Sequence, residues 1–201
     1  MTGKRGRPSA AEASARDERV VDVVIALLTA EGFEALTFDR VAAEAHVAKR
    51  TLYGVFGDRE GLVRAAIRRQ HPYLADAGDG VADLRSACRA ILVQLLADEA
   101  VGIHRAIIAA AARHPSLAAE FYDDGPRRAQ DFLAAHLPTN AEVSPEILFA
   151  ALLGEPHRRR LLGLVDTPTS AEIDAQVDDV LRLLGLHAPT HESAGRESSS
   201  S

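Results

Sequence analysis

The sequence predicts an all-α protein, from its composition and its hydrophobic spacing. Apolar residues make up 47% of the 201 residues, whereas aromatic residues make up 4% and Trp is absent. Ala and Leu dominate the apolar set, and such a composition favours helices. Val and Ile recur at helical spacing rather than in alternation, so no segment has the pattern of a strand. About nine helices are expected.

The chain begins with a polar segment, residues 1–15, whose cations are Lys4, Arg5 and Arg7. Its glycines and Pro8 disfavour a helix. Two interpretations remain open: a disordered tail, or a flexible basic arm that follows the DNA backbone or enters the minor groove.

A first long helix is predicted at 16–31, because apolar residues recur there every three or four positions and Gly32 follows. Its apolar stripe consists of Val20, Val23, Val24, Leu27 and Leu28. This helix should pack across the short helices that follow it, and Phe33 and Leu36 should fill the same core.

Residues 37–62 are the segment around which the rest of the chain is organised. Apolar spacing predicts a short helix at 37–45, capped by Thr37, and a second at 49–56 after a short break. Two short helices joined by a tight turn form a helix-turn-helix.

The second short helix has an apolar stripe formed by Leu52, Val55 and Phe56. Gly57 should end this helix, because glycine readily adopts the left-handed conformation that follows a helix. Asp58 should cap the next helix, which then begins immediately.

The outer face of the second helix carries groups that bind DNA. Lys49 and Arg50 can neutralise phosphates, and the hydroxyls of Thr51 and Tyr53 can hydrogen-bond to phosphates or bases. Such a helix fits the major groove. The alternative is a plain helical hairpin with a solvated polar face, but the length of the pattern and its place near the N-terminus favour DNA binding.

This stretch resembles the DNA-binding signature of the TetR family of bacterial transcriptional repressors. The matching residues are Thr37, Val41, Ala42, Ala45, Val47, Thr51, Leu52, Tyr53, Phe56, Glu60 and Leu62. The sequence departs from the family pattern at His46, where a turn glycine is usual, and at Gly54, where a larger side chain is common. It also has Ala48 in place of a capping Ser, a change that costs about 1 kcal/mol of helix stability.

The resemblance implies a helix-turn-helix DNA-binding domain at 16–58, a helical ligand-binding and dimerisation domain at 59–186, and a homodimer that reads a palindromic operator. It implies release from double-stranded DNA by a small-molecule effector. Thr51 and Gly54 would face bases, and the other contacts would be chiefly to phosphates. The implied DNA-binding residues are Lys4, Arg5, Arg7, Thr37, Arg40, Lys49, Arg50, Thr51, Tyr53, Gly54 and Arg59.

The net charge of −6 is unevenly distributed. Residues 1–70 carry 12 Lys and Arg against 10 Asp and Glu, which gives +2, and residues 71–201 carry 11 against 19, which gives −8. Between His46 and Arg69, six cations accompany two carboxylates. A basic face at one end of an acidic protein suits DNA contact there and repulsion elsewhere.

The fourth helix, from Arg59 to about Leu74, should join the two domains and transmit a ligand signal. A break is expected at 71–80, and residues 187–201 should be disordered. Residues 113–137 are similar to the middle of the ligand domain of one TetR subgroup. Further helices are predicted near 81–97, 101–113, 115–122, 126–137, 145–163 and 170–185, with Pro115, Pro126 and Pro145 in first turns.

The resemblance also implies a ligand pocket among the middle helices. Its candidate residues suit an apolar or aromatic effector with one or two polar anchors. Cys88 among them is either a redox-sensitive thiol or a buried inert one, and the second is favoured. The candidates are Cys88, Leu92, His104, Ile108, Phe121, Tyr122, Phe132 and Phe149.

The last two predicted helices have more apolar surface than a small domain needs to cover its own core. In the family the corresponding pair forms a four-helix bundle with its twin; the alternative is an internal core. Arg158, Arg159 and Arg160 are expected on a solvated face, or paired across the interface with Asp174, Asp178 or Asp179, rather than on DNA. The candidate dimer residues are Leu148, Leu152, Leu161, Ile173, Val177, Val180, Leu181 and Leu184.

Several classes of protein are disfavoured. The eight histidines and one cysteine form no metal-binding motif, and His46, His114 and His157 are expected at the surface. No nucleotide-binding or nucleophile motif occurs, so we predict no cofactor and no enzyme. No apolar run reaches about 18 residues and no secretory signal is evident, which predicts a cytoplasmic protein. An activator, a ligand-independent DNA-binding protein and, less favoured, a helical-bundle enzyme remain alternatives.

Overall fold

The computed structural model describes residues 9–70 and 83–186, in which every regular element is helical. The elements are α1 (Ala10–Glu31), η1 (Phe33–Ala35), α2 (Phe38–Glu44), α3 (Lys49–Phe56), α4 (Arg59–Arg69), α5 (Leu84–Leu95), α6 (Asp98–Ala111), α7 (Pro115–Tyr122), η3 (Asp123–Arg127), α8 (Arg128–His136), α9 (Pro145–Leu161) and α10 (Ser170–Leu183). The all-α prediction is confirmed. The break predicted at 71–80 and the disordered tail predicted at 187–201 both lie outside the described residues.

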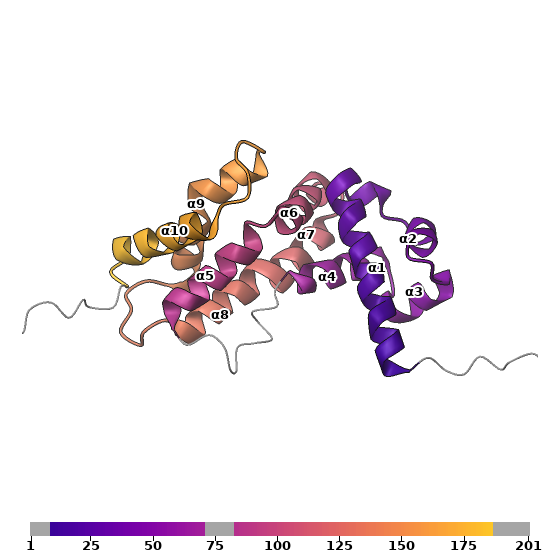
Figure 1. The fold of residues 1–201 in the computed structure, drawn as a ribbon, viewed down its shortest axis with the longest axis horizontal. Helices are drawn as coiled ribbons and strands as arrows, with labels where there is room; N and C mark the ends of the chain where they lie inside the picture. Colours follow the sequence, from indigo (N-terminus) through magenta and orange to yellow (C-terminus); the bar gives the residue numbers. More distant parts are fainter. Residues whose placement is uncertain (1–8, 71–82, 187–201) are drawn as a thin grey trace, which may run out of the picture.

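The helices are arranged along one long axis (Figure 1). α1 to α3 lie at one end, α5 and α8 to α10 at the other, and α4, α6 and α7 between them. None of the helices in the described ranges is long and apolar enough to cross a lipid bilayer.

The first helix begins earlier than the sequence predicted. α1 starts at Ala10 rather than at residue 16, so the prediction that residues 1–15 precede the first helix is wrong from Ala10 onward. A capping box stabilises this start: the Ser9 hydroxyl accepts from the Glu12 backbone N–H at 3.2 Å, and the Glu12 carboxylate accepts from the Ser9 N–H at 2.7 Å.

The predicted boundaries of the helix-turn-helix are confirmed. Thr37 caps α2 by accepting from the Arg40 N–H, and Asp58 caps α4 by accepting from the Gly61 N–H. Gly57 ends α3 with a φ of 77°, a conformation that favours glycine. α4 ends at Arg69, earlier than predicted.

Two hydrophobic clusters form the interior. The first joins α1 to α4 with α6 and α7, and Phe33 and Leu36 are buried in it as predicted. The second joins α5, α8, α9 and α10. The helices α6 and α7 therefore pack on α1 to α4, although α5 lies between α4 and α6 in the sequence.

The junction of α7 and α8 is a π-helical turn rather than the break that the sequence predicted. η3 continues the chain from Tyr122 to Arg128 without leaving helical conformation, and Pro126 lies inside it rather than in a first turn. A π turn hosts an extra residue in a helix, which relaxes the geometry around a proline that has no N–H to donate. Pro115 and Pro145 do lie in first turns, as predicted.

α9 is kinked in the middle. Gly154 has φ 41° and ψ −142°, which is not helical, and Pro156 follows within the same helix. The kink divides α9 into a half that contacts α8 and a half that ends beside α6. The sequence predicted one continuous helix here.

Arg160 is buried, which corrects the prediction of a solvated or interface residue. Its side chain is 7% exposed and donates to the carbonyl oxygens of Leu96 and Val165 and to the Asp98 carboxylate at 2.5 Å. This contact with Arg160 lowers the pKa of the Asp98 carboxyl. The guanidinium thus ties the end of α9 to the junction of α5 and α6.

The aspartates of α10 pair within the chain. Asp174 binds Arg89 at 2.9 Å and Asp178 binds Arg85 at 2.6 Å, so both hold α10 against α5. The pairing of these aspartates with the arginines at 158–160 was predicted across a dimer interface, and it stays a prediction.

Candidate functional site

The turn between α2 and α3 has a strained residue at its centre. His46 has a φ of 54° and is the one non-glycine residue with positive φ in the described ranges. Around it the Val47 N–H donates to the Ala42 carbonyl at 3.0 Å and the His46 N–H to the Ala43 carbonyl at 3.4 Å, which is the Schellman pattern. Glycine is favoured at this position because it has no Cβ to clash there.

Helix α3, the second short helix of the helix-turn-helix, has a polar outer face. Lys49, Arg50, Tyr53 and Gly54 are exposed, and Thr51 is half-buried. Tyr53 stacks on Phe38 of α2, with ring centroids 4.2 Å apart and an interplanar angle of 5°.

Two further features of α3 bear on the predictions. Ala48, the N-cap residue of α3, forms no side-chain cap, because its methyl group cannot accept a hydrogen bond. Val55 is 46% exposed, so its assignment to the apolar stripe is wrong, whereas Leu52 is buried and Phe56 packs against the first cluster.

Most cations of this end are held by carboxylates. Arg40 binds Glu31 and Glu44, and Lys49 binds Asp39 at 2.8 Å. The hydrogen bond from Arg40 lowers the pKa of the Glu31 carboxyl, and the hydrogen bond to Asp39 raises the pKa of the Lys49 ammonium.

Arg59 and Arg50 differ in the contacts of their guanidinium groups. Arg59 lies 3.9 Å over the ring of Phe33 and 3.7 Å from the Glu34 carboxylate. Arg50 forms no ion pair with any residue in the described ranges. It is therefore the cation of α3 that is available without exchange of a partner.

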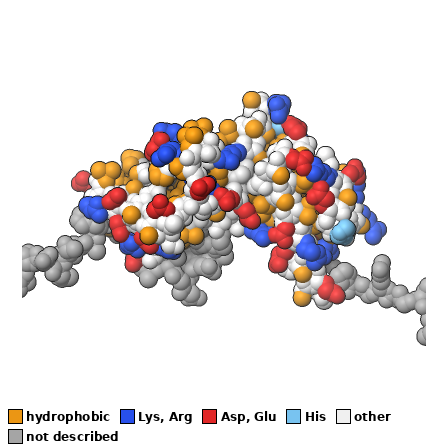
Figure 2. All heavy atoms as spheres, turned by 45° about the horizontal axis from the view of Figure 1, so that its top comes forward, with side chains coloured by type: hydrophobic (Ala, Val, Ile, Leu, Met, Phe, Trp, Pro, Cys, Tyr) orange, Lys and Arg blue, Asp and Glu red, His pale blue; other side chains and the backbone are white. Residues whose placement is uncertain are grey.

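The basic character of this end is weaker than the local sequence predicted. On the face shown in Figure 2, Lys and Arg alternate with Asp and Glu over both ends of the molecule. The acidic partners come from other elements, as in the pairs of Arg64 with Glu120 and of Arg69 with Asp22. Lys4, Arg5 and Arg7 lie outside the described residues.

A second candidate site is a cavity between the two hydrophobic clusters. An enclosed chamber of about 50 Å³ adjoins a groove of about 620 Å³. The residues that line both are His104, Phe121, Pro126, Phe149, Leu153 and His157. They come from α6, α7, η3 and α9, so the π turn and the kinked helix both shape the site.

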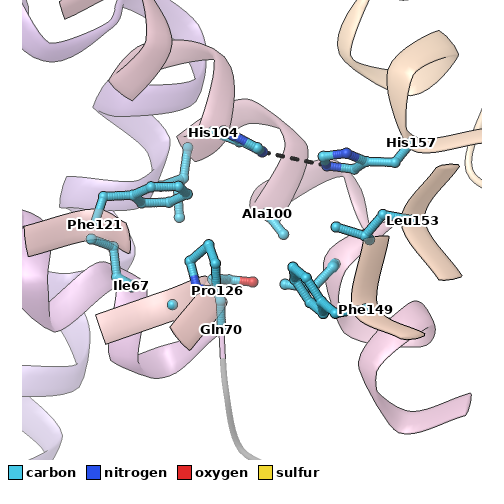
Figure 3. Close-up of a pocket in the computed structure, with 12 residues that line it drawn as sticks. Ile67, Gln70, Ala100, His104, Phe121, Pro126, Phe149, Leu153 and His157 are labelled. Atoms are coloured by element: carbon cyan, nitrogen blue, oxygen red, sulfur yellow. Dashed lines mark hydrogen bonds between the residues drawn. The ribbon is translucent and has the colours of Figure 1, made fainter. Parts of the chain in front are cut away.

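Two histidine side chains, His104 and His157, lie next to each other in the lining of the cavity. His104 Nδ1 lies 3.4 Å from His157 Nε2, and the two rings point toward each other in Figure 3, with Phe121 on one side and Phe149 and Leu153 on the other. Burial and the neighbouring His157 lower the pKa of His104 to about 4, and burial and Arg160 lower the pKa of His157. Both rings are therefore neutral near pH 7.

The cavity reaches the C-terminal end of α4. Ile67 and Gln70, at the C-terminal end of α4, line the enclosed chamber. Gln70 is buried, accepts from Gln94 at 2.8 Å and donates to Glu99 at 3.3 Å. A change in the chamber would therefore act directly on the end of α4.

The predicted pocket residues divide into two groups. His104, Phe121 and Phe149 line both chamber and groove, and Ile108 and Tyr122 line the groove. The other three, Cys88, Leu92 and Phe132, are buried in the second cluster instead, because α5 and α8 turn these side chains toward α9 and α10. Burial raises the pKa of the Cys88 thiol to about 12, which favours the inert alternative.

His157 corrects a further prediction, since it is buried rather than at the surface. Phe149, Leu153 and His157 follow one another at intervals of four residues, and this helical spacing could have predicted that His157 is buried. No such spacing in the sequence indicated that Gln70 lines the cavity. Of the other histidines expected at the surface, His46 is exposed, and His114 is half-buried with its ring edge against Phe33. No group of three or more potential metal ligands occurs within the described ranges.

The predicted dimer residues are mostly interior. Leu148, Leu152, Ile173, Val177 and Leu181 are buried in the second cluster of the same chain, which corrects their assignment to an interface. Leu161, Val180 and Leu184 are half-buried. The exposed positions of the last two helices include Ile147, Ala150, Ala171, Ala175 and Leu183.

Two family models match the chain. Residues 20–66 match the model described as bacterial regulatory proteins, tetR family, and residues 82–184 match the model described as AefR-like transcriptional repressor, C-terminal domain. No curated protein matches the sequence at a significant level.

Several solved structures share the fold. The chain is similar to the flavonoid-responsive regulator FrrA at 26% identity and a TM-score of 0.60, over 85% of this chain and 95% of that one. It is similar to a TetR transcriptional regulator from Agrobacterium tumefaciens at 28% identity and a TM-score of 0.57, over 84% and 93%. It also resembles the multidrug binding protein EbrR, solved with imidazole, at 22% identity and a TM-score of 0.57, over 91% and 99%.

Proposed function

Because the chain belongs to the tetR family of bacterial regulatory proteins, we propose that it is a homodimeric transcriptional repressor that a small-molecule effector releases from a palindromic operator. The observation on which this proposal depends is α3, a helix that packs against α2 and α4 and has Lys49, Arg50 and Tyr53 on its exposed face. Such a helix can enter the major groove. The match to the AefR-like repressor model supports a repressor rather than an activator.

The residues of α3 have distinct proposed roles. Thr51 and Gly54 face bases, and Lys49, Arg50 and Tyr53 contact phosphates. Thr37, at the start of α2, has an exposed position beside them.

The flanking cations complete the proposed contacts. Arg40 and Arg59 reach phosphates after they leave their carboxylate partners, an exchange that costs little because an exposed ion pair contributes about 0–1 kcal/mol. The N-terminal Lys4, Arg5 and Arg7 add contacts to the backbone or the minor groove.

The proposed dimer forms through the exposed faces of α9 and α10. Ala171, Ala175 and Leu183 are all exposed on α10, where Ala175 follows Ala171 by four positions and Leu183 follows Ala175 by eight. Small side chains allow a second helix to approach closely, and an exposed Leu gains from burial. A two-fold dimer matches the symmetry of a palindromic operator.

The effector is proposed to occupy the cavity that His104 and His157 line. The walls suit an apolar or aromatic molecule, and the similar FrrA is described as flavonoid-responsive. Because Ile67 and Gln70 form part of the chamber, binding would displace α4 and change the spacing of the two recognition helices. The protein is expected to act in the cytoplasm, where bacterial DNA lies.

A salt-titrated binding assay tests the DNA-binding proposal. The full-length protein is titrated with the DNA that flanks its own gene and with an unrelated fragment of equal length. Saturable, tighter binding to a discrete palindrome in the first fragment is expected. Equal weak binding to both fragments, followed by failure to select any palindrome from a genomic library, would refute the repressor.

Arg50→Ala gives the sharpest test of the proposed face. It removes an exposed charge without breaking an ion pair in the described ranges, so it should weaken binding to all sequences and reduce the salt slope by about 1. Arg159→Ala, which also removes an exposed charge without breaking an ion pair in the described ranges, is the matched control on α9 and should leave the slope unchanged. An unchanged slope in Arg50→Ala removes this residue from the contacts.

Sedimentation equilibrium tests the dimer. Ala175→Glu would place a charge in the proposed interface and should yield a monomer, whereas Ala134→Glu on the exposed face of α8 should not. Both substitutions put Glu at an exposed helical position, so their intrinsic effects on folding are similar. A dimer that survives Ala175→Glu would assign the interface to another surface.

A further inference from the structure

The two histidines of the cavity form a neutral pair that shares one hydrogen bond. His104 Nδ1 and His157 Nε2 are 3.4 Å apart, and their ring centroids are 5.1 Å apart (Figure 3). Because both rings are neutral, each has one N–H and one acceptor nitrogen. The N–H of one ring donates to the other, and that contact uses one donor and one acceptor of the pair.

The remaining two nitrogens, His104 Nε2 and His157 Nδ1, then have complementary roles. One carries an N–H and the other accepts, and a shift of tautomer in both rings exchanges these roles. Neither nitrogen has a hydrogen-bond partner within the described ranges. No buried side-chain nitrogen or oxygen in those ranges lacks a partner, so these two nitrogens are accessible from the chamber or the groove.

The other polar groups near the chamber are already engaged. Both ends of the Gln70 amide are hydrogen-bonded, to Gln94 and Glu99. The nearby Arg160 guanidinium binds Asp98 and two carbonyl oxygens. Among the side chains that line the chamber, the histidine pair therefore provides the free hydrogen-bonding capacity, whereas Tyr122 and Gln130 line only the groove.

The charge of the cavity disfavours an anionic ligand. No Lys, Arg, Asp or Glu of the described ranges lines the enclosed chamber, and Arg158 and Glu146 line only the outer groove. A carboxylate that entered the chamber would lose its hydration without meeting a cation, which is strongly unfavourable. Phe121 and Phe149 instead offer aromatic surface on either side of the pair.

We propose, building on the effector site proposed above, that the cavity selects an uncharged aromatic molecule that carries a hydroxyl group, with His104 and His157 as its anchor. A hydroxyl is both donor and acceptor, so it can pair with a free nitrogen of the histidine pair in either tautomeric arrangement. The enclosed chamber receives the hydroxylated edge. The groove of about 620 Å³ has the size of a small-molecule site and receives the rest of the ring system.

A matched set of naphthalene probes tests this selection on the full-length protein in the absence of DNA. The probes are 2-naphthol, 2-methoxynaphthalene, naphthalene and 2-naphthoate, which share one ring system and differ at a single substituent. The chain has no Trp, so probe fluorescence is read with little background from the protein. We expect 2-naphthol to bind about tenfold more tightly than 2-methoxynaphthalene or naphthalene, and 2-naphthoate to bind most weakly.

Histidine variants connect the selection to the pair. In His157→Phe the affinity ratio of 2-naphthol to 2-methoxynaphthalene should fall to about one, while naphthalene still binds, because the ring volume is kept and the hydrogen bonds are lost. His104→Phe should behave in the same way. His136→Phe, at the end of α8 and outside the cavity lining, is the control and should keep the ratio of the wild type.

Three results would overturn the proposal: equal affinities for 2-naphthol and 2-methoxynaphthalene in the wild type, tightest binding of 2-naphthoate, or no binding of any probe. The first measurement uses the wild type alone, so it stands even where a variant fails to fold. Failure of the DNA titration with the naphthol selection intact would instead refute the repressor and leave the anchor in place.

Discussion

Gly102 of α6 lies directly against Thr29 of α1. A Cβ atom built on Gly102 would lie 2.9 Å from the Thr29 Cβ and closer still to its methyl group. His104, which lines the cavity, is two residues further along the same helix. The wall of the cavity and the packing of the DNA-binding end are therefore fixed by one short segment of α6.

Gly102→Ala should destabilise the protein by about 1–3 kcal/mol, because the added methyl group has no room beside Thr29 and the two helices must separate. The free energy of unfolding, measured by chemical denaturation, checks this. Gly54→Ala is the control: its Cβ would meet nothing within 4 Å, so its stability should be equal or slightly higher. The double variant Gly102→Ala with Thr29→Ala should regain part of the loss, and a Gly102→Ala variant as stable as wild type contradicts the close packing.

His46→Gly should stabilise the protein by about 0.5–1 kcal/mol, because glycine adopts the positive φ of 54° without a steric penalty. Thermal or chemical unfolding measures the change. Ala43→Gly, on the exposed face of α2, is the matched control and should lower stability by a similar amount, since glycine is unfavourable within a helix. A loss of stability in His46→Gly would mean that the imidazole makes a compensating contact in solution.

Arg160→Met should lower the free energy of unfolding by about 2–4 kcal/mol. The change leaves the Leu96 and Val165 carbonyl oxygens without their donor and removes a buried charge from its carboxylate partner. The neighbouring Arg159 is exposed and has no ion pair in the described ranges, so Arg159→Met should change stability by less than about 0.5 kcal/mol. Equal effects of the two substitutions would argue against the buried network.

Stability should fall as the pH is lowered from about 6.5 toward 4, because the pKa of His104 is about 4 in the folded protein and near 6.5 in the unfolded chain. In that window the unfolded state binds a proton that the folded state excludes, and the contribution, on the order of 2–3 kcal/mol, is fully present above pH 6.5. The lowered pKa of His157 acts in the same direction.

Denaturation midpoints between pH 5 and 7 measure this slope, above the range where the carboxylates titrate. His104→Gln should flatten the slope, and His114→Gln, outside the cavity lining, should retain it. A wild-type protein with equal stability at pH 5 and 7 would show that the pair is solvated.

The helix-turn-helix was predictable because its signals are local. Thr37 and Asp58 cap the helices that directly follow them, and Gly57 ends the helix that directly precedes it. Neighbouring residues in the sequence were therefore enough to predict these helix ends. The start of α1 had an equally local signal in Ser9 and Glu12, which the polar composition of the segment obscured.

The cavity was less predictable because its geometry depends on distant elements. His157 and Arg160 were expected at the surface, but the kink at Gly154 and the carbonyl groups of α5 and of the loop after α9 place them inside. Cys88 and Phe149 are both apolar and both belong to the second cluster, and only the packing of α5 and α9 makes Phe149, but not Cys88, line the cavity.

The π turn η3 also determines the phase of the helices on either side of it. One extra residue in a helical turn rotates all that follows by about 100° about the axis. Leu117, before the turn, belongs to the first hydrophobic cluster, and Leu133, after it, belongs to the second. The continuous helical segment α7–η3–α8 thus packs in both clusters, and loss of one residue from η3 would rotate Leu133 and the rest of α8 relative to α7.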